Sequence, residues 1–207
     1  MKRIIILILL QFTCAITIAQ VNLVRNPSFE QHSQCPNAWD QIRFANYWSP
    51  IDTVSIDPIC SPEYCNVCAG SNPFSGAPNN GYFYQYPRTG NGLVQVMMFY
   101  DESVPPPPPY YRDYLQGRLY QTLVNGKQYC VTFYTVLEES SDYAIANIGA
   151  YLDNGSIDNT DSIGCAAPQT SHIPQVENTT IIYDTMHWVK IEGYIYCKWH
   201  GEIHHYR

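Results

Sequence analysis

Short stretches in which apolar and polar residues alternate recur along the chain. Residues 94–98 alternate after the turn at 90–92, and residues 188–195 alternate again near the end. Residues 145–152 form a further apolar stretch. Stretches of this length, with a period of two and turn residues at their ends, are typical of β-strands. Since no amphipathic segments of about 10 to 15 residues separate them, the pattern predicts an all-β fold, an antiparallel β-sandwich.

A strong turn signal divides two other strand-like stretches. Asn125 and Gly126 lie between residues 119–124 and residues 129–134. Asn-Gly is favoured in the two-residue turns of β-hairpins, because both positions there need a positive φ. We therefore expect these two stretches to pair as a hairpin, with a longer loop through Lys127 and Gln128 as the alternative.

The first 19 residues have the three parts of a secretory signal peptide. Lys2 and Arg3 precede the apolar run Ile4–Leu10, and the small-residue exit Thr17–Ala19 follows. The apolar run is shorter than the roughly 20 residues of a membrane-spanning helix. We expect residues 1–19 to be removed and the mature protein to be secreted or held at the cell surface, without membrane insertion.

Charge narrows the range of partners. The chain has 11 basic and 18 acidic residues, a net charge of −7. Removal of Lys2 and Arg3 leaves nine basic residues and a net charge of −9. Nucleic-acid binding relies on basic surfaces that neutralise phosphates, so the balance argues against nucleic acid as a partner.

Export also changes how the cysteines are interpreted, because disulfides persist outside the cytosol. The mature chain has an odd number of cysteines, seven, of which Cys197 is the last. The six disulfide candidates are Cys35, Cys60, Cys65, Cys68, Cys130 and Cys165. We expect at least one bridge within residues 35–68, a long segment with few apolar residues. The alternative for Cys60, Cys65 and Cys68 is a zinc or redox site, but no second Cys-x-x-Cys pair accompanies them.

Several segments, in a fixed order, carry a resemblance to a known family. The opening Asn22–Glu30, read as NLVRNPSFE, resembles the start of carbohydrate-binding modules with a galactose-binding-domain-like jelly roll. Further matching segments follow in the same order: Trp48, 78–81, 84–90, 90–96, 115–123, 126–133 and 187–193. The chain is most similar to cysteine-containing amino-terminal modules of secreted Bacteroidota proteins. The resemblance covers residues 21–195 and implies a jelly-roll β-sandwich over residues 20–196.

The resemblance also implies a metal ligand. In such modules a glutamate at the position of Glu30 often helps to hold a structural calcium ion. A carboxylate with backbone carbonyls is a suitable oxygen shell for calcium. The alternative is a solvated or salt-bridged Glu30.

A sugar site would need flat apolar faces and a few polar groups. Tyr82, Tyr84 and Tyr86 share one face if their segment is extended, and Arg88 follows them. Together with Trp48, these residues are the candidate ligand-binding set, for a polysaccharide or other glycan. The alternative is that the same rings pack between the sheets.

Signals for catalysis are weak. No Gly-x-Ser-x-Gly nucleophile elbow occurs, and the acidic residues show no pairing typical of glycoside hydrolysis. The segment 200–205 places three histidines around Glu202, but not in the His-Glu-x-x-His spacing. The sequence therefore favours a secreted non-catalytic module that binds glycans. The alternatives are a structural or adhesive module without a sugar site and, less favoured, a metal-dependent hydrolase.

The end of the chain departs from the family pattern. After Ile195, related modules continue with a strand resembling Ala-Asn-Gly-x-Glu-Lys-Tyr-Ile-Thr-Ile. Reading the codons of Cys197–Arg207 one base later permits such a strand. We expect residues 197–207 to be an out-of-frame tail and the jelly roll to lack its last strand.

Overall fold

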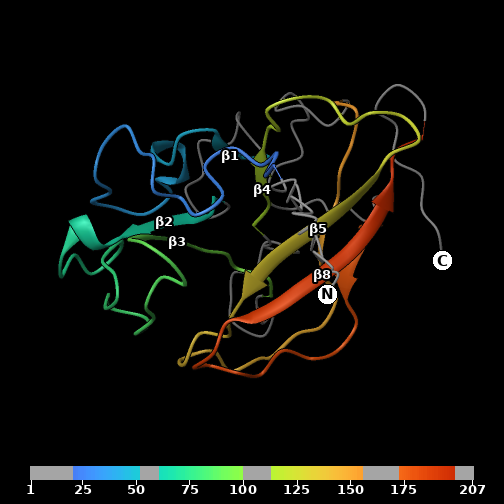
Figure 1. Cartoon of the computed structure of the whole chain (residues 1–207). Helices are drawn as coiled ribbons and strands as arrows, with labels where there is room; N and C mark the ends of the chain where they lie inside the picture. The colour runs from blue at the N-terminus through green and yellow to red at the C-terminus, as the bar shows by residue number, and fades with distance from the viewer. Residues whose placement is uncertain (1–20, 52–60, 100–112, 156–172, 199–207) are drawn as a thin grey trace, which may run out of the picture.

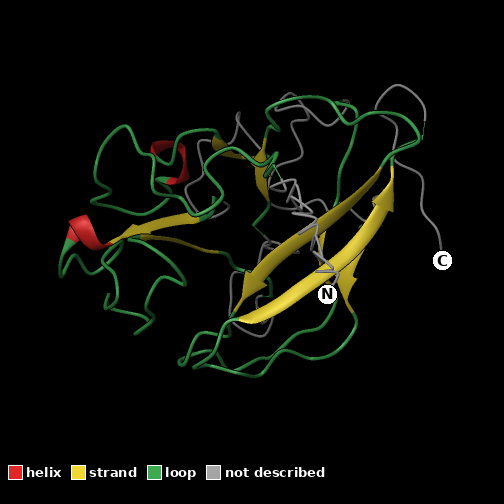
Figure 2. Cartoon of the chain, viewed as in Figure 1, coloured by secondary structure: helices red, strands yellow, loops and turns green. Residues whose placement is uncertain are grey.

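The computed structural model describes residues 21–51, 61–99, 113–155 and 173–198. Within them, helix is confined to two short 3-10 turns, η1 (Ile42–Phe44) and η3 (Val67–Ala69). Everything else is strand, turn or loop (Figure 2). The all-β prediction is therefore confirmed. No helix within the described ranges has the length and apolar character needed to cross a membrane.

The strands pair two by two, always antiparallel. β1 (Trp48–Pro50) pairs with β4 (Leu115–Gly117), and β2 (Glu63–Asn66) pairs with β3 (Gly92–Gln95). β6 (Ile148–Ala150) pairs with β7 (Val176–Asn178). The longest pair joins β5 (Gln128–Thr135) to β8 (Val189–Tyr196), as Figure 1 shows.

The alternation of β8 appears in the structure as the sequence predicts. Ile191 and Ile195 are buried, whereas Lys190, Glu192, Tyr194 and Tyr196 are exposed. Gly193 lies on the inner face, where an added Cβ would stand 2.8 Å from Cγ2 of Val176. The glycine thus lets β7 pack closely across β8. The inner face joins Leu123, Val176, Ile182 and Cys197 in the largest apolar cluster.

The predicted hairpin at Asn125-Gly126 is wrong in its pairing. The turn itself forms, because Lys127 N donates to Val124 O at 3.1 Å and Gly126 has a φ of 72°. However, β5 takes β8 as its partner in place of residues 119–124. Leu123 turns into the core instead, and pairing with the distant β8 gives β5 a complete eight-residue ladder.

Cys197 extends this ladder by one residue. Its N–H donates to Lys127 O at 3.0 Å, its carbonyl accepts from Gly126 N at 2.7 Å, and its side chain is buried. Cys197 is the first residue of the predicted tail, and the boundary at residue 196 stays a prediction. The rest of the tail prediction concerns residues 199–207, which lie outside the described residues.

The β2–β3 pair separates two smaller clusters. Tyr64 and Val94 face a cluster built on Ile42 and Ala45, while Cys65 and Leu93 face one that contains Phe83. Both faces of this short pair are therefore covered. In Figure 1 this part of the chain lies to the left of the β5–β8 ribbon, with β1 and β4 between them.

Candidate functional site

Asn80 shapes the segment that carries the predicted tyrosines. Its side chain is buried, and its Oδ1 accepts from the N–H groups of Tyr82 and Phe83 at 2.9 and 3.1 Å. Phe83 is the inward anchor of the segment and is buried. Its neighbours point the other way, so Tyr82, Tyr84 and Tyr86 are 48%, 52% and 60% exposed. The three rings that the sequence placed on one face are thus on the surface.

Distant residues hold this segment by its backbone. Ser140 Oγ donates to Tyr82 O at 2.9 Å, and Tyr84 N donates to Glu139 Oε2 at 3.1 Å. Trp188 Nε1 donates to Tyr86 O at 3.1 Å. These bonds fix the main chain without using the tyrosine side chains, which stay about half exposed.

Two further aromatic side chains extend the surface. Trp39 lies edge-on to Tyr82, with ring centroids 4.8 Å apart, and Phe74 lies 5.2 Å from Trp39. Tyr84 and Tyr86 are perpendicular, 5.6 Å apart, with their hydroxyls 3.0 Å from each other. We call Trp39, Phe74, Tyr82, Tyr84 and Tyr86 the aromatic surface. Its rings stand at steep angles and do not form one plane.

Arg88 follows the aromatic surface and has a fixed position. Its guanidinium carbon lies 3.7 Å from the ring centroid of Tyr134 on β5, a cation–π contact. The side chain remains exposed. The contact therefore holds an exposed arginine side chain against Tyr134.

Trp48 is placed differently from the other predicted ligand residues. Its Nε1 donates to Asn26 O at 2.9 Å, its ring centroid lies 5.0 Å from that of Phe29, and Gly117 packs against its ring. Through these contacts the ring packs against the apolar cluster around Ile42. Trp48 thus contributes to packing while it remains half-buried. Its role in ligand binding stays a prediction.

Glu30 accepts hydrogen bonds from the turn before β3. Its Oε1 accepts from Asn91 N and Gly92 N at 2.8 and 2.9 Å, and Oε2 accepts from Asn91 Nδ2 at 3.3 Å. Gly90 has a φ of 66°, and an added Cβ would lie 2.4 Å from the Glu30 carboxyl carbon. The carboxylate thus ties the opening segment to this turn. Among the described residues no group of three or more His, Cys, Asp or Glu is arranged to hold a metal ion.

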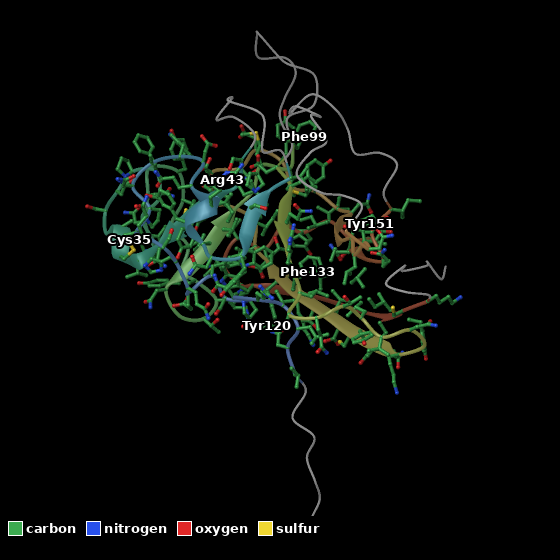
Figure 3. The ribbon with its side chains drawn as sticks, turned by 90° about the horizontal axis from the view of Figure 1, so that it is seen from above. Cys35, Arg43, Phe99, Tyr120, Phe133 and Tyr151 are labelled. Carbon is green, nitrogen blue, oxygen red and sulfur yellow. A yellow bond between two sulfur atoms is a disulfide. The ribbon has the colours of Figure 1, made fainter. Side chains whose placement is uncertain are left out.

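A cleft of about 2150 Å³ borders the aromatic surface. Trp39, Tyr82 and Arg88 contribute to its lining, as do Tyr134 and Trp188. Seen from above, Phe133 of β5 lies near the middle of the molecule, with Cys35 toward one end and Tyr151 toward the other (Figure 3).

Three carboxyl groups that the sequence did not single out also line the cleft: Asp40, Glu63 and Asp113. The pKa of Glu63 is raised to about 8, mainly by burial. The hydrogen bond from Asp40 N lowers this pKa, whereas the negative charges of Asp40 and Asp113 raise it. Burial also raises the pKa of Asp113 to about 7, and the charge of Asp40 adds to it. Near pH 7, Glu63 is therefore largely protonated. Two of the three carboxyl groups accept a backbone hydrogen bond: Glu63 from Asp40 N at 2.5 Å and Asp113 from Met97 N at 2.6 Å.

The cysteines give one disulfide in the described residues. Cys35 and Cys68 are bonded, with their Cα atoms 6.0 Å apart, which confirms the prediction of a bridge within residues 35–68. Cys65, Cys130 and Cys197 are free thiols, and burial raises the pKa of Cys65 to about 12. Since Cys68 is bonded to Cys35, a Cys65–Cys68 redox pair is not what forms here. Cys60 and Cys165 lie outside the described residues, as do the histidines of residues 200–205.

Comparisons with protein-family models, with curated proteins and with solved structures find no match for this chain. What it does must therefore be argued from the site alone.

Proposed function

We propose that this chain is a secreted, non-catalytic module with a jelly-roll fold, and that it binds glycan chains at the aromatic surface. The signal-peptide pattern of residues 1–19 supports export, and the Cys35–Cys68 disulfide is compatible with it. The antiparallel pairing of β5 with the distant β8 is the kind of long-range connection that a jelly roll requires.

One observation carries the binding proposal. Tyr82, Tyr84 and Tyr86 are about half exposed although their backbone is bonded on three sides to distant residues. Exposed aromatic rings on a fixed backbone lose little conformational entropy when a ligand stacks on them. Pyranose rings present apolar C–H faces to such rings, while tyrosine hydroxyls and an arginine can bond to sugar hydroxyls.

The ring angles favour one kind of glycan. Tyr84 and Tyr86 are perpendicular, and Tyr82 is tilted by 62° against Trp39. A flat crystalline polysaccharide would need rings in a common plane. We therefore expect a single soluble chain, whose successive sugar rings can turn to meet each face.

The test is retention on a glycan array and in affinity gels that contain soluble polysaccharides. The wild-type protein should be retained by at least one glycan. The double variant Tyr84→Ala/Tyr86→Ala should lose this retention, because two stacking faces are removed. The matched control, Tyr194→Ala/Tyr196→Ala, removes two tyrosines that are 66% and 47% exposed on the outer face of β8 and should behave as wild type.

Thermal unfolding of the same proteins separates binding from stability. Exposed rings contribute little to the core, so the midpoint should hardly change, whereas cutting a buried aromatic residue to alanine costs about 3 to 5 kcal/mol. A folded wild-type protein that no glycan retains would contradict the proposal and favour the structural or adhesive alternative. Retention that survives in the Tyr84/Tyr86 variant would also contradict it.

A further inference from the structure

A second, separate group of side chains brings an arginine between two exposed tyrosines. The guanidinium carbon of Arg25 lies 5.2 Å from the ring centroid of Tyr47 and 5.2 Å from that of Tyr120. The two rings are 50% and 57% exposed. None of the three residues lines the cleft beside the aromatic surface.

The fold fixes each member of this group from a different segment. Val24 and Leu119 form an antiparallel bridge, and Tyr120 N donates to Leu23 O at 2.8 Å, so Tyr120 lies next to the opening segment (Figure 3). The side chain of Asn26 donates to Asn46 O at 3.0 Å. This bond holds the residue before Tyr47 to the residue after Arg25.

The backbone at Tyr47 is in an unusual conformation. Its φ is 72°, in the left-handed region that a bulky residue rarely adopts. Such strain is kept only where the surroundings enforce it, and it is common at ligand sites. Here the bond from Asn26 Nδ2 to Asn46 O and the bond from Trp48 Nε1 to Asn26 O enforce it on both sides. The ring of Tyr47 is thereby presented to Arg25.

The donors of Arg25 have no hydrogen-bond acceptor within the part of the chain that the structure describes. Within the described ranges Arg25 makes its two cation–π contacts, and no side-chain or backbone acceptor takes a hydrogen bond from its guanidinium. Its Nε is buried without a hydrogen-bond partner. A buried donor that is left unpaired costs free energy, and most such groups in proteins have a partner. The side chain is therefore held in place without an acceptor of its own.

We propose that Arg25, Tyr47 and Tyr120 form a binding site for a carboxylate-bearing sugar, a uronate unit of an acidic saccharide. A guanidinium presents paired N–H groups whose spacing matches the two oxygens of a carboxylate. The exposed parts of the two tyrosine rings offer apolar surface beside the guanidinium for the pyranose ring that carries this carboxylate. This site is independent of the aromatic surface and of the proposal made for it.

The experiment is a calorimetric titration with a trimer of galacturonic acid and with its methyl ester, which keeps the rings but removes the charge. The acid should bind at least tenfold more tightly than the ester, and its affinity should fall as salt is added. Arg25→Gln should lower the affinity for the acid at least tenfold. Tyr194→Ala/Tyr196→Ala, which removes two exposed rings from the outer face of β8, should leave this affinity unchanged.

Thermal unfolding identifies variants that fail to fold. Tyr120→Ala removes only an exposed ring and keeps Arg25, so it tests the site even if Arg25→Gln unfolds, and it too should weaken binding of the acid. Equal affinity for acid and ester, unchanged affinity in both variants, or no binding at all would overturn the proposal. Equally tight binding of a triglutamate peptide would overturn the assignment to a saccharide.

Discussion

Asp113 should make the stability of the protein depend on pH. Its side chain is only 7% exposed, and its pKa is raised from the ordinary 3.8 to about 7, chiefly by burial. As the pH rises from about 4 to about 7, the unfolded chain loses this proton while the folded chain keeps it. The free energy of unfolding therefore falls over that range. The difference between the two pKa values sets a ceiling of about 4 kcal/mol, and relaxation around the carboxyl should reduce the loss to about 2 kcal/mol.

Asp113→Asn tests this reasoning. Asparagine resembles the protonated acid and keeps an oxygen that can accept from Met97 N. Urea unfolding can be followed by tryptophan fluorescence at pH 5, 6, 7 and 8. The free energy of unfolding should fall with rising pH in the wild type, and it should fall less in the variant. Asp142→Asn, at an exposed position, should follow the wild type. Because Glu63 shares the effect, some decline should remain. Parallel curves for wild type and Asp113→Asn would refute the argument.

Two further predictions concern the fold. Gly117→Ala should destabilise the protein by about 1 to 3 kcal/mol, because the added Cβ would lie 2.7 Å from Cζ3 of Trp48. Urea unfolding checks this prediction, with Gln121→Ala at an exposed position as the control. Equal stability of the wild type and Gly117→Ala would contradict the close packing of Gly117 against Trp48. Cys35→Ser/Cys68→Ser removes a disulfide that closes a loop with a sequence separation of 33. The change should lower the free energy of unfolding by about 2 to 4 kcal/mol, whereas the control Cys130→Ser should not. An unchanged unfolding midpoint would show that the bridge does not stabilise the fold.

Local pattern predicted the parts of the fold that depend on local geometry. The alternation of β8 follows directly from the period of a strand, so Ile191 and Ile195 were identifiable as inward residues. The Asn125-Gly126 turn was equally identifiable. The partner strand of β5 was not identifiable from the sequence. A turn sequence predicts where the chain changes direction, but it does not predict which strand will pair with β5. That pairing depends on how much apolar surface a distant strand can bury.

The site shows the same division. The spacing of Tyr82, Tyr84 and Tyr86 predicted a common face but left open whether this face is exposed. The structure shows these three side chains exposed and Phe83 buried. The packing of Trp48 against Gly117 was not evident from the sequence, since it joins two strands that are distant along the chain. The contact of Trp39 with Tyr82 and the bond from Trp188 to Tyr86 also depend on tertiary packing. Pairing of Cys35 with Cys68 was one of several arrangements that the spacing allowed.

The most direct test of the proposed glycan site is to map the bound ligand on the protein. Backbone amide resonances would be followed by NMR while the soluble glycan retained in affinity gels is added. We expect the largest shifts at residues 82–88 and at Glu139 and Ser140, whose side chains bond to that segment. Shifts confined to the outer face of β8, or no shifts at saturating glycan, would contradict the assignment of binding to the aromatic surface.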